Sequence, residues 1–343
     1  MKAALLVSPS HIEISDLPIP VPGPGEVLIR VRSVGICGSD VHYFVDGRIG
    51  ETVANQPLIL GHEFAGEVAG VGPGVAGLTL GQRVAVDPAI PCGHCEMCLL
   101  GHPNLCLNIR FMSTPPDQGA LTEYVVASAE RCFLLPDSLS FAEGAMLEPL
   151  GVALHATRLA KLFIGDSAGV VGCGPIGLLV LQLLHASGAL SLVATDRLDY
   201  RLEYARRWGA DLLVNVAREN PSEAVHAFTR GRGLDVVFEA AGSAEAPEQA
   251  ARLARNGARV LLIGIPPENS FTLTASLTRR KGLTLKAVRR MKHTYQRAIA
   301  LTQAGRVDLK ALITHRFPLS ETEAAFSLVA GQRDGVIKAL VEL

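Results

Sequence analysis

Four cysteines stand close together in the first third of the chain, with two, two and seven residues between them: Cys92, Cys95, Cys98 and Cys106. Four thiolates at this spacing can surround one Zn²⁺ as a tetrahedron. A complete set of four sulfurs leaves no coordination position for a substrate, so the cluster predicts a structural zinc site. The alternative interpretation is a group of reduced thiols or a redox-active pair.

A second set of metal-binding residue types is spread over the first half of the chain. Cys37 stands alone, His62 and Glu63 are adjacent, and Glu148 follows much later. One thiolate, one imidazole and one or two carboxylates suit a zinc site that keeps a position open for water or substrate. A lone histidine or a lone buried cysteine is more often structural, so the residues by themselves leave both interpretations open.

A glycine pattern, G-x-G-x-x-G, begins at Gly172, directly after an apolar run and directly before a helical pattern. In this context Gly172 permits a tight turn, Gly174 lets the backbone approach a pyrophosphate, and Gly177 lets the helix pack on the strand. The helix that starts at Pro175 and Ile176 offers N–H donors and a partial positive charge. The alternative is a plain glycine turn without a ligand.

Asp196 ends the apolar run that follows this helical pattern. A carboxylate there can accept hydrogen bonds from both hydroxyls of an adenosine ribose and repels a 2′-phosphate, which favours NAD over NADP. Arg197 and Arg201 act against this preference, because an arginine can receive a phosphate. The alternative is an aspartate that is only solvated.

The elements around these residues change character near residue 150. Beyond it, short apolar runs alternate with helical patterns. This alternation predicts a doubly wound parallel sheet, a Rossmann NAD-binding domain over about 151–289. The expected strands are 168–171, 191–194, 211–215, 235–238 and 259–263, and the expected helices are 175–187, 199–208, 221–230 and 246–255.

The first 150 residues are typical of a β-rich domain, in which Val27, Ile29 and Val31 alternate with outward positions between Gly/Pro turns. Residues 88–118 have little periodicity and form a lobe around the cysteine cluster. The segment Ser320 to Glu323 matches a capping box that opens a helix to about residue 328. An apolar run at 337–341 is expected to return to the β-rich domain, which would then comprise 1–150 and about 290–343.

The composition excludes several classes of protein. The chain has 343 residues, and its 32 Lys and Arg nearly balance 33 Asp and Glu, which argues against nucleic-acid or anionic-membrane binding. With 48% hydrophobic and 19% charged residues, a sizeable core is possible and global disorder is not. We find no signal-peptide core and no clean apolar stretch of membrane-spanning length, and expect a soluble, cytoplasmic protein.

Taken together, these segments resemble the zinc-dependent medium-chain alcohol dehydrogenase superfamily, and within it the sorbitol/xylitol (polyol) dehydrogenase branch. The motifs follow the family's order over essentially the whole chain: G-I-C-G-S-D-V-H-Y at 35–43, G-H-E at 61–63, the four-cysteine lobe, F-x-x-T-P-P at 111–116, E-P-L at 148–150 and G-C-G-P-I-G at 172–177. The resemblance implies a GroES-like catalytic domain joined to the Rossmann domain.

The resemblance also implies which residues hold a catalytic zinc ion. Cys37, His62 and Glu63 match the family's ligands, with Glu148 either on the metal or one water away. Which of Glu63 and Glu148 contacts the metal stays open. Many alcohol dehydrogenases carry a cysteine where this chain has Glu148, so the glutamate indicates the polyol branch.

Two further matches concern proton transfer. Ser39 matches the hydroxyl that takes the substrate proton, and His42 matches the imidazole at the outer end of that relay. The alternatives are that Ser39 is a helix N-cap and that His42 is an exposed helix residue.

For the substrate pocket, Tyr43 and Phe111 match aromatic wall positions of the branch, and Arg289 matches an arginine that the family follows with an aromatic residue. Here Arg290 stands in place of that aromatic residue, which puts the preferred polyol in doubt. The alternative for both arginines is a solvated basic turn.

The implied activity is the reversible oxidation of a secondary hydroxyl of a sugar alcohol to a ketose with NAD⁺, with a small-molecule polyol as partner and two zinc ions per chain. Competing interpretations are a threonine or simple secondary-alcohol dehydrogenase, a non-catalytic nucleotide-binding relative, and a zinc-ribbon nucleic-acid binder. Apolar strand edges at 271–273 and 283–285 could pair between copies, so we expect a homo-oligomer, a tetramer with a dimer as the alternative.

Overall fold

The computed structural model describes residues 1–54 and 57–343, which form two compact units. Unit 1 comprises Met1–Glu148, Tyr295–Gln303 and Leu309–Leu343, and unit 2 comprises Pro149–Thr294 and Ala304–Asp308. The chain therefore returns to unit 1 at Tyr295, a few residues later than the expected position near 290. The short segment Ala304–Asp308 belongs to unit 2 again, before the chain continues in unit 1.

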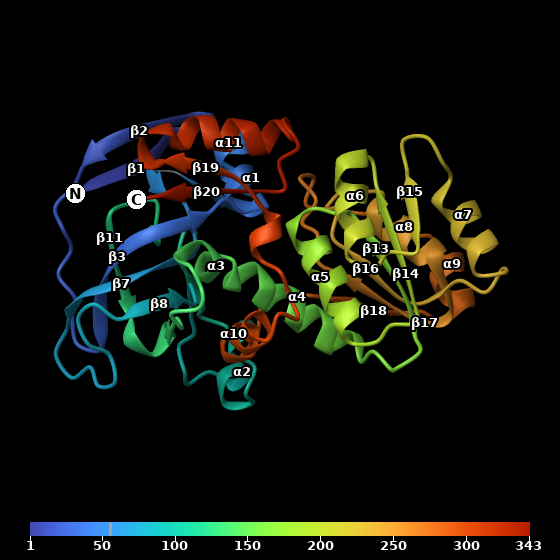
Figure 1. Ribbon diagram of the computed structural model, residues 1–343, viewed down its shortest axis with the longest axis horizontal. Helices are drawn as coiled ribbons and strands as arrows, with labels where there is room; N and C mark the ends of the chain where they lie inside the picture. The colour runs from blue at the N-terminus through green and yellow to red at the C-terminus, as the bar shows by residue number, and fades with distance from the viewer. Residues whose placement is uncertain (55–56) are drawn as a thin grey trace. The chain divides into compact units, whose positions relative to one another are not determined.

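Unit 1 is built around a seven-stranded sheet with the order β12-β8-β7-β3-β20-β19, in which β11 also pairs with β3 (Figure 1). The strands of this sheet are β3 (Glu26–Gly35), β7 (Glu63–Val71), β8 (Arg83–Val86), β11 (Tyr124–Ser128), β12 (Cys132–Leu134), β19 (Ile313–Pro318) and β20 (Lys338–Glu342). The smaller sheets use β1 (Lys2–Ser8), β2 (His11–Asp16), β4 (Arg48–Ile49), β5 (Thr52–Val53) and β6 (Leu58–Ile59). The helices are α1 (Gly38–Asp46), α3 (Phe141–Ala145), α10 (Tyr295–Gln303) and α11 (Thr322–Gly331).

The central strand of this sheet is β3. Val27, Ile29 and Val31 are each at most 1% exposed, so the alternation seen in the sequence does mark a buried face. The strand β20 pairs antiparallel with β3, with Leu340 opposite Gly35. The expected return of the C-terminal strand to the β-rich part of the chain is therefore confirmed, one residue later than expected.

The predicted capping box at residues 320–323 is wrong. Ser320 lies in a 3₁₀ turn, and α11 begins at Thr322, preceded by Glu321, which makes no side-chain capping bond. The Glu323 carboxylate instead accepts the backbone N–H of Ile12 at 2.8 Å. A tertiary partner thus replaced the local one that the spacing suggested.

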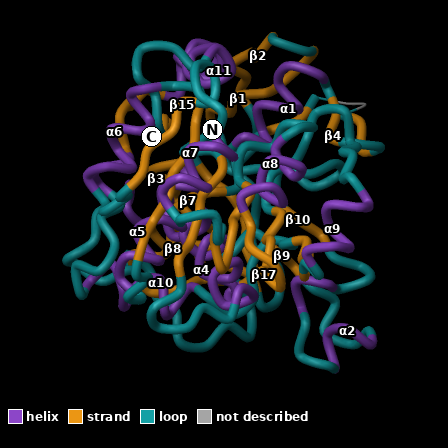
Figure 2. The backbone as a smooth tube through the Cα atoms, turned by 90° about the vertical axis from the view of Figure 1, so that its right-hand side faces the viewer, coloured by secondary structure: helices purple, strands orange, loops and turns teal. Residues whose placement is uncertain are grey.

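The cysteine lobe contains only short elements: β9 (Ala89–Ile90), α2 (Glu96–Leu99) and β10 (Arg110–Phe111), with β9 and β10 paired antiparallel. In both views, the segment around α2 stands away from the main sheet of unit 1 (Figures 1 and 2). With so little regular structure, a lobe of this kind needs a local cross-link such as a metal ion.

Unit 2 contains a six-stranded parallel sheet with the order β15-β14-β13-β16-β17-β18. The strands are β13 (Ser167–Val171), β14 (Ser191–Asp196), β15 (Leu212–Asn215), β16 (Leu234–Glu239), β17 (Ala254–Leu262) and β18 (Thr284–Ala287). The helices are α4 (Leu147–Ala160), which starts in unit 1, α5 (Pro175–Ala186), α6 (Asp199–Arg207), α7 (Pro221–Phe228), α8 (Ala246–Leu253) and α9 (Ala275–Lys281).

Every residue of β13 and of β16 is buried, as expected for a parallel sheet covered on both faces. Helices α5 and α6 lie on one side of this sheet, and α7, α8 and α9 on the other (Figure 1). The strand order reverses between β13 and β16, the position where open α/β sheets bind ligands at the carboxyl ends of their strands. The predicted doubly wound fold is confirmed. Among the described residues, no helix is long and apolar enough to cross a membrane.

Candidate functional site

Cys37, His62 and Glu63 come together in unit 1. Cys37 precedes α1 directly, and His62 and Glu63 stand at the start of β7, the strand beside β3. One ligand atom from each residue lies within 4.8 Å of the others, and His62 and Glu63 are buried. A thiolate, an imidazole and a carboxylate this close form a donor set that fits a zinc ion with a free coordination position.

Asp40, which the sequence reasoning did not single out, fixes the imidazole of this group. Its Oδ1 lies 3.2 Å from His62 Nδ1, and Ser113 Oγ donates to the same oxygen at 2.6 Å. This leaves His62 Nε2 for a metal, the usual arrangement of a metal-binding histidine. Burial alone would lower the pKa of His62, but the charges of Asp40 and Cys37 outweigh burial and raise that pKa well above its ordinary value. The available signal was an aspartate one helical turn beyond Cys37.

Lys338 on β20 is the second residue that the sequence reasoning missed. Its Nζ forms an ion pair with Glu63 Oε2, and the two side chains are only 2% and 1% exposed. Burial alone would lower the pKa of Lys338, but Glu63 and Cys37 outweigh it and raise that pKa. A single lysine within the apolar run at 336–341 was the signal, because a buried charge requires a partner.

Glu148 lies in the first turn of α4 and is 4% exposed. Burial raises the pKa of its carboxyl group to about 8, with Glu63 and Asp87 adding to the effect and His62 opposing it. Among the described residues, the close group of ligand atoms contains Glu63 and does not contain Glu148. The geometry therefore favours Glu63 as the carboxylate next to Cys37 and His62.

The two residues expected to move a proton both lie on α1. Ser39 Oγ donates to Cys37 Sγ at 3.3 Å. The N-cap of this helix is Cys37, so the alternative role of Ser39 as N-cap is wrong. His42 Nδ1 lies 3.7 Å from Asp46 Oδ2, and its side chain is 22% exposed.

Of the residues expected to line the substrate pocket, Phe111 lies close to the metal-binding group, with its ring centroid 5.1 Å from that of His62. Tyr43 is 2% exposed and packs within the core of unit 1. Arg289 and Arg290 follow β18 in unit 2, where Arg289 is exposed and Arg290 has a left-handed backbone with φ of 52°. The roles of these residues toward a substrate stay predictions.

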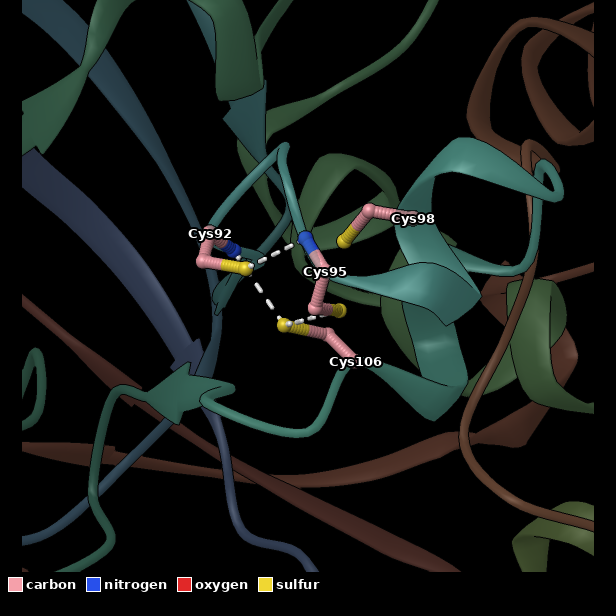
Figure 3. A group of neighbouring side chains, drawn as sticks. All are labelled: Cys92, Cys95, Cys98 and Cys106. Carbon is pink, nitrogen blue, oxygen red and sulfur yellow. Dashed lines mark hydrogen bonds between the residues drawn. The ribbon is translucent and has the colours of Figure 1, made fainter.

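The four cysteines of the lobe gather their sulfur atoms around one point (Figure 3). Cys95 Sγ lies 3.8 Å from Cys106 Sγ, and Cys106 Sγ accepts the backbone N–H of Cys92 at 3.2 Å. Zinc–sulfur bonds of about 2.3 Å in a tetrahedron separate the sulfurs by about 3.8 Å. The cluster therefore has the dimensions of a structural zinc site.

The thiols of the lobe differ in acidity when no cation is bound. Backbone N–H groups of Cys98 and Leu107 lower the pKa of Cys95 to about 6. Burial and the neighbouring cysteines raise the pKa of Cys98 to about 12. Four thiolates so close together repel one another, and a divalent cation removes that repulsion.

In unit 2 the glycine turn connects β13 to α5. Gly172 has φ of 91°, and a Cβ there would lie 2.6 Å from the backbone of Ala241. A Cβ on Gly177 would collide with the carbonyl of Gly172, so this glycine lets α5 approach the turn. Gly174 is the N-cap of α5, without a side-chain capping bond, and Pro175 is the first helical residue. The first N–H groups of the helix, including that of Ile176, therefore have no side-chain cap.

Asp196 closes this turn from the end of β14. Its Oδ2 accepts the N–H of Cys173 at 2.7 Å, and its Oδ1 accepts that of Leu198 at 2.9 Å. A carboxylate has about four acceptor positions, so two remain for ribose hydroxyls. Arg201 Nη1 lies 3.9 Å from Asp196 Oδ2 and within 4.0 Å of where a Cβ on Gly174 would stand.

Comparison with known proteins agrees with this geometry. Residues 23–137 match the alcohol dehydrogenase GroES-like domain, and residues 175–304 match the zinc-binding dehydrogenase family. The chain is 38% identical to sorbitol dehydrogenase of Bacillus subtilis, with 99% of this chain and 97% of the relative covered. It is 40% identical to human sorbitol dehydrogenase, with 93% and 89% covered.

Solved structures give the same assignment. An Escherichia coli oxidoreductase/dehydrogenase of unknown specificity superposes with a TM-score of 0.94 at 36% identity, covering 99% of this chain and 98% of its own. An E. coli alcohol dehydrogenase complexed with NADH has a TM-score of 0.92 at 30% identity, and a Sinorhizobium meliloti zinc-binding dehydrogenase bound to NADP has 0.91 at 31%, each covering 100% of this chain and 99% of its own. The chain therefore belongs to the zinc-dependent medium-chain alcohol dehydrogenase superfamily, in its sorbitol (polyol) dehydrogenase branch.

Proposed function

We propose that this protein is a zinc-dependent polyol dehydrogenase that oxidises a secondary hydroxyl of a sugar alcohol to a ketone with NAD⁺. The observation that carries the proposal is the group of Cys37, His62 and Glu63, whose ligand atoms lie within 4.8 Å of one another. The relatives named sorbitol dehydrogenase support the substrate class. We expect the reaction to run in both directions, because the ketone can take back the hydride from the reduced cofactor together with one proton.

Cys37, His62 and Glu63 would hold the ion of the active site. A bound zinc ion lowers the pKa of an attached water from 15.7 to about 7, and an attached alcohol should respond similarly. Asp40 keeps the His62 imidazole in the tautomer that presents Nε2 to a metal, and Ser113 holds Asp40. Glu148, buried in the first turn of α4, would form a hydrogen bond with the substrate hydroxyl or with a zinc-bound water.

The proton of the substrate hydroxyl leaves through α1. The Ser39 hydroxyl lies beside Cys37 and can accept that proton as it gives its own to the next acceptor. His42 lies three residues further along, almost one helical turn, and is partly exposed; it passes the proton to solvent. The alcohol loses a hydride from its carbinol carbon, which the nicotinamide cofactor would accept, and one proton from its hydroxyl, which Ser39 and His42 would carry away.

We infer NAD rather than NADP as the cofactor. Asp196 ends the strand that follows the glycine turn, and a carboxylate at this position of the fold favours ribose hydroxyls and repels a 2′-phosphate. Arg201 is already paired with that carboxylate, which reduces its availability for a phosphate. The NADP-bound relative keeps NADP as the alternative.

A second zinc ion in the cysteine lobe serves the fold and not the reaction, since four sulfurs fill its coordination sphere. We also infer a homo-oligomer, a tetramer or a dimer. The strand β18 ends the sheet of unit 2, and Leu285 on it is 37% exposed, so a second copy could extend the sheet there.

The test is the initial rate of NAD⁺ reduction with sorbitol, xylitol, ribitol, galactitol, threonine and a simple secondary alcohol, with and without a strong chelator. The proposal expects the highest kcat/KM with one polyol and loss of that activity with chelator. Activity with threonine or the simple alcohol alone would assign the chain to a different substrate class.

Metal content gives an independent check. The wild type should hold two zinc ions per chain, and Cys37→Ser should keep one and lose activity. The matched control is Cys132→Ser, because Cys132 belongs to neither of the two candidate metal sites. This substitution should leave zinc content and activity unchanged. A single zinc ion in the wild type would contradict the proposed active site.

A further inference from the structure

The ion pair between Glu63 and Lys338 spans three strands of the sheet. The order β7-β3-β20 places β3 between the strands that carry the two charges. Gly35, the last residue of β3, lies opposite Glu63 on one side and opposite Leu340 on the other. Lys338 precedes Leu340 by two residues, so its side chain leaves β20 on the same face.

The absence of a side chain at Gly35 is what lets the two charges meet. A Cβ on Gly35 would lie 3.0 Å from Lys338 Cε and closer still to Glu63 Oε2. Gly35 has no left-handed backbone, so the turn conformation does not explain why glycine stands here. The ion pair occupies the space that a side chain at position 35 would need. The contacts of Gly35 therefore explain the glycine by this pair.

Pairing of the strands continues past Gly35, because Ile36 donates its N–H to the carbonyl of Ala339 at 3.1 Å. The backbone of β20 therefore runs beside the segment that leads into Cys37. The ammonium group of Lys338 is buried and pairs with Glu63, one of the three residues that would hold the metal.

We propose that Lys338, reaching Glu63 across Gly35, is a positioning residue of the active site that holds the Glu63 carboxylate in place for the metal. The inference rests on the proposed function, in which Glu63 is a zinc ligand. One carboxylate oxygen pairs with the ammonium group, and the other is available to the ion. A ligand fixed in this way before the metal arrives loses less freedom on binding, and partners of metal ligands typically change metal affinity about 10- to 100-fold.

The charge of Lys338 also has an opposing effect on zinc binding. The ammonium group repels a zinc ion, so removal of Lys338 alone changes both the position of Glu63 and the electrostatic potential. Gly35→Ala separates the two effects, because it displaces the pair while both charges stay in the protein. If positioning dominates, Gly35→Ala and Lys338→Met should both weaken zinc binding.

The experiment is the release of zinc to excess chromogenic chelator, followed without substrate or cofactor. The wild type should release one ion quickly, from the Cys37 group, and one slowly, from the cysteine lobe. Gly35→Ala and Lys338→Met should accelerate the fast phase about tenfold or more, and Lys338→Arg should restore most of the wild-type rate. The slow phase should not change, which reports that the variants are folded.

The matched control is Gly38→Ala, since a Cβ on Gly38 would meet nothing within 4 Å. It should release zinc at the wild-type rate. In protein loaded with Co²⁺, Gly35→Ala and Lys338→Met should also shift the visible absorption of the metal, because its carboxylate ligand moves.

Unchanged release from Gly35→Ala would overturn the inference and leave the proposed function standing. Slower release from Lys338→Met would also overturn it, since repulsion would then be the dominant effect of the lysine. If Lys338→Met does not fold, Gly35→Ala and Lys338→Arg decide the question. A wild type that holds only the slowly released ion would refute the proposed active site and this inference together.

Discussion

We expect the dinucleotide site to be sensitive to the replacement of one oxygen atom of Asp196. The two carboxylate oxygens accept the N–H groups of Cys173, inside the glycine turn, and of Leu198 at 2.7 and 2.9 Å. An asparagine has one accepting oxygen, so Asp196→Asn turns an NH₂ group toward one of these N–H groups. A buried donor left without a partner costs about 1–3 kcal/mol. If the turn must be re-formed on binding, NADH binds about 5- to 150-fold more weakly.

The assay is a fluorescence titration with NADH and, in parallel, with NADPH. Loss of the carboxylate charge should weaken NADPH binding less than NADH binding, so the ratio of the two Kd values shifts toward NADPH. Asp199→Asn is the matched control. It removes one negative charge three residues further along the chain, and the side chain of Asp199 is 60% exposed. Its NADH affinity should stay within about twofold of the wild type. Wild-type NADH affinity in Asp196→Asn would refute the reasoning.

Three further predictions concern other contacts. Ser113→Ala removes the 2.6 Å hydrogen bond to buried Asp40 and should lower the free energy of unfolding by about 1.5–3 kcal/mol in urea denaturation, whereas Ser113→Gly should lower it less, because Ser113 has φ of 65°. Gly172→Ala should abolish NADH binding in calorimetry and keep both zinc ions, since its Cβ would lie 2.6 Å from Ala241. Burial alone would raise the pKa of Asp235, but Arg232, Ser167 and Arg255 outweigh it and hold that pKa far below its usual range. The stabilisation is therefore complete above about pH 4 and lost as the pH falls further. Asp235→Asn should cost about 1.5–3 kcal/mol near pH 7, because the two arginines that lose a charged partner are 55% and 30% exposed. It should also make the urea midpoint depend less on pH below about 4.

The parts of the site that the sequence predicted well are those whose chemistry is local. The glycine turn needs a positive φ at Gly172 and no side chain at Gly177, and only glycine meets both requirements within a short segment. The same holds for the cysteine lobe, where ligands a few residues apart must meet whatever the rest of the chain does. Most strands and helices of unit 2 lie within two or three residues of their predicted bounds, because fully buried parallel strands are continuous apolar runs.

The parts that the sequence did not predict depend on partners far away in the chain. The spacing gave Glu323 of α11 a local partner in Ser320, yet its carboxylate accepts the N–H of Ile12 in β2, more than 300 residues away in the chain. Lys338 and Glu63 pair because the sheet places their strands on the two sides of β3. No local sequence pattern predicts that strand order. The strand β17 starts at Ala254 and not near 259, since its irregular first residues carry no apolar periodicity.

The position of Lys338 also bears on the order in which this chain would acquire its two proposed zinc ions during synthesis. The cysteine lobe is complete as soon as residue 106 has emerged, and its ligands close a short loop at little entropic cost. The Cys37 group is held in its final form only after β20 has joined β3, which requires nearly the whole chain to have been made. Domains fold as they emerge from the ribosome at about 5–20 residues per second, so the two centres mature many seconds apart. In a cell short of zinc, the cysteine lobe of the nascent chain could therefore bind zinc first, and the Cys37 group would compete for it later.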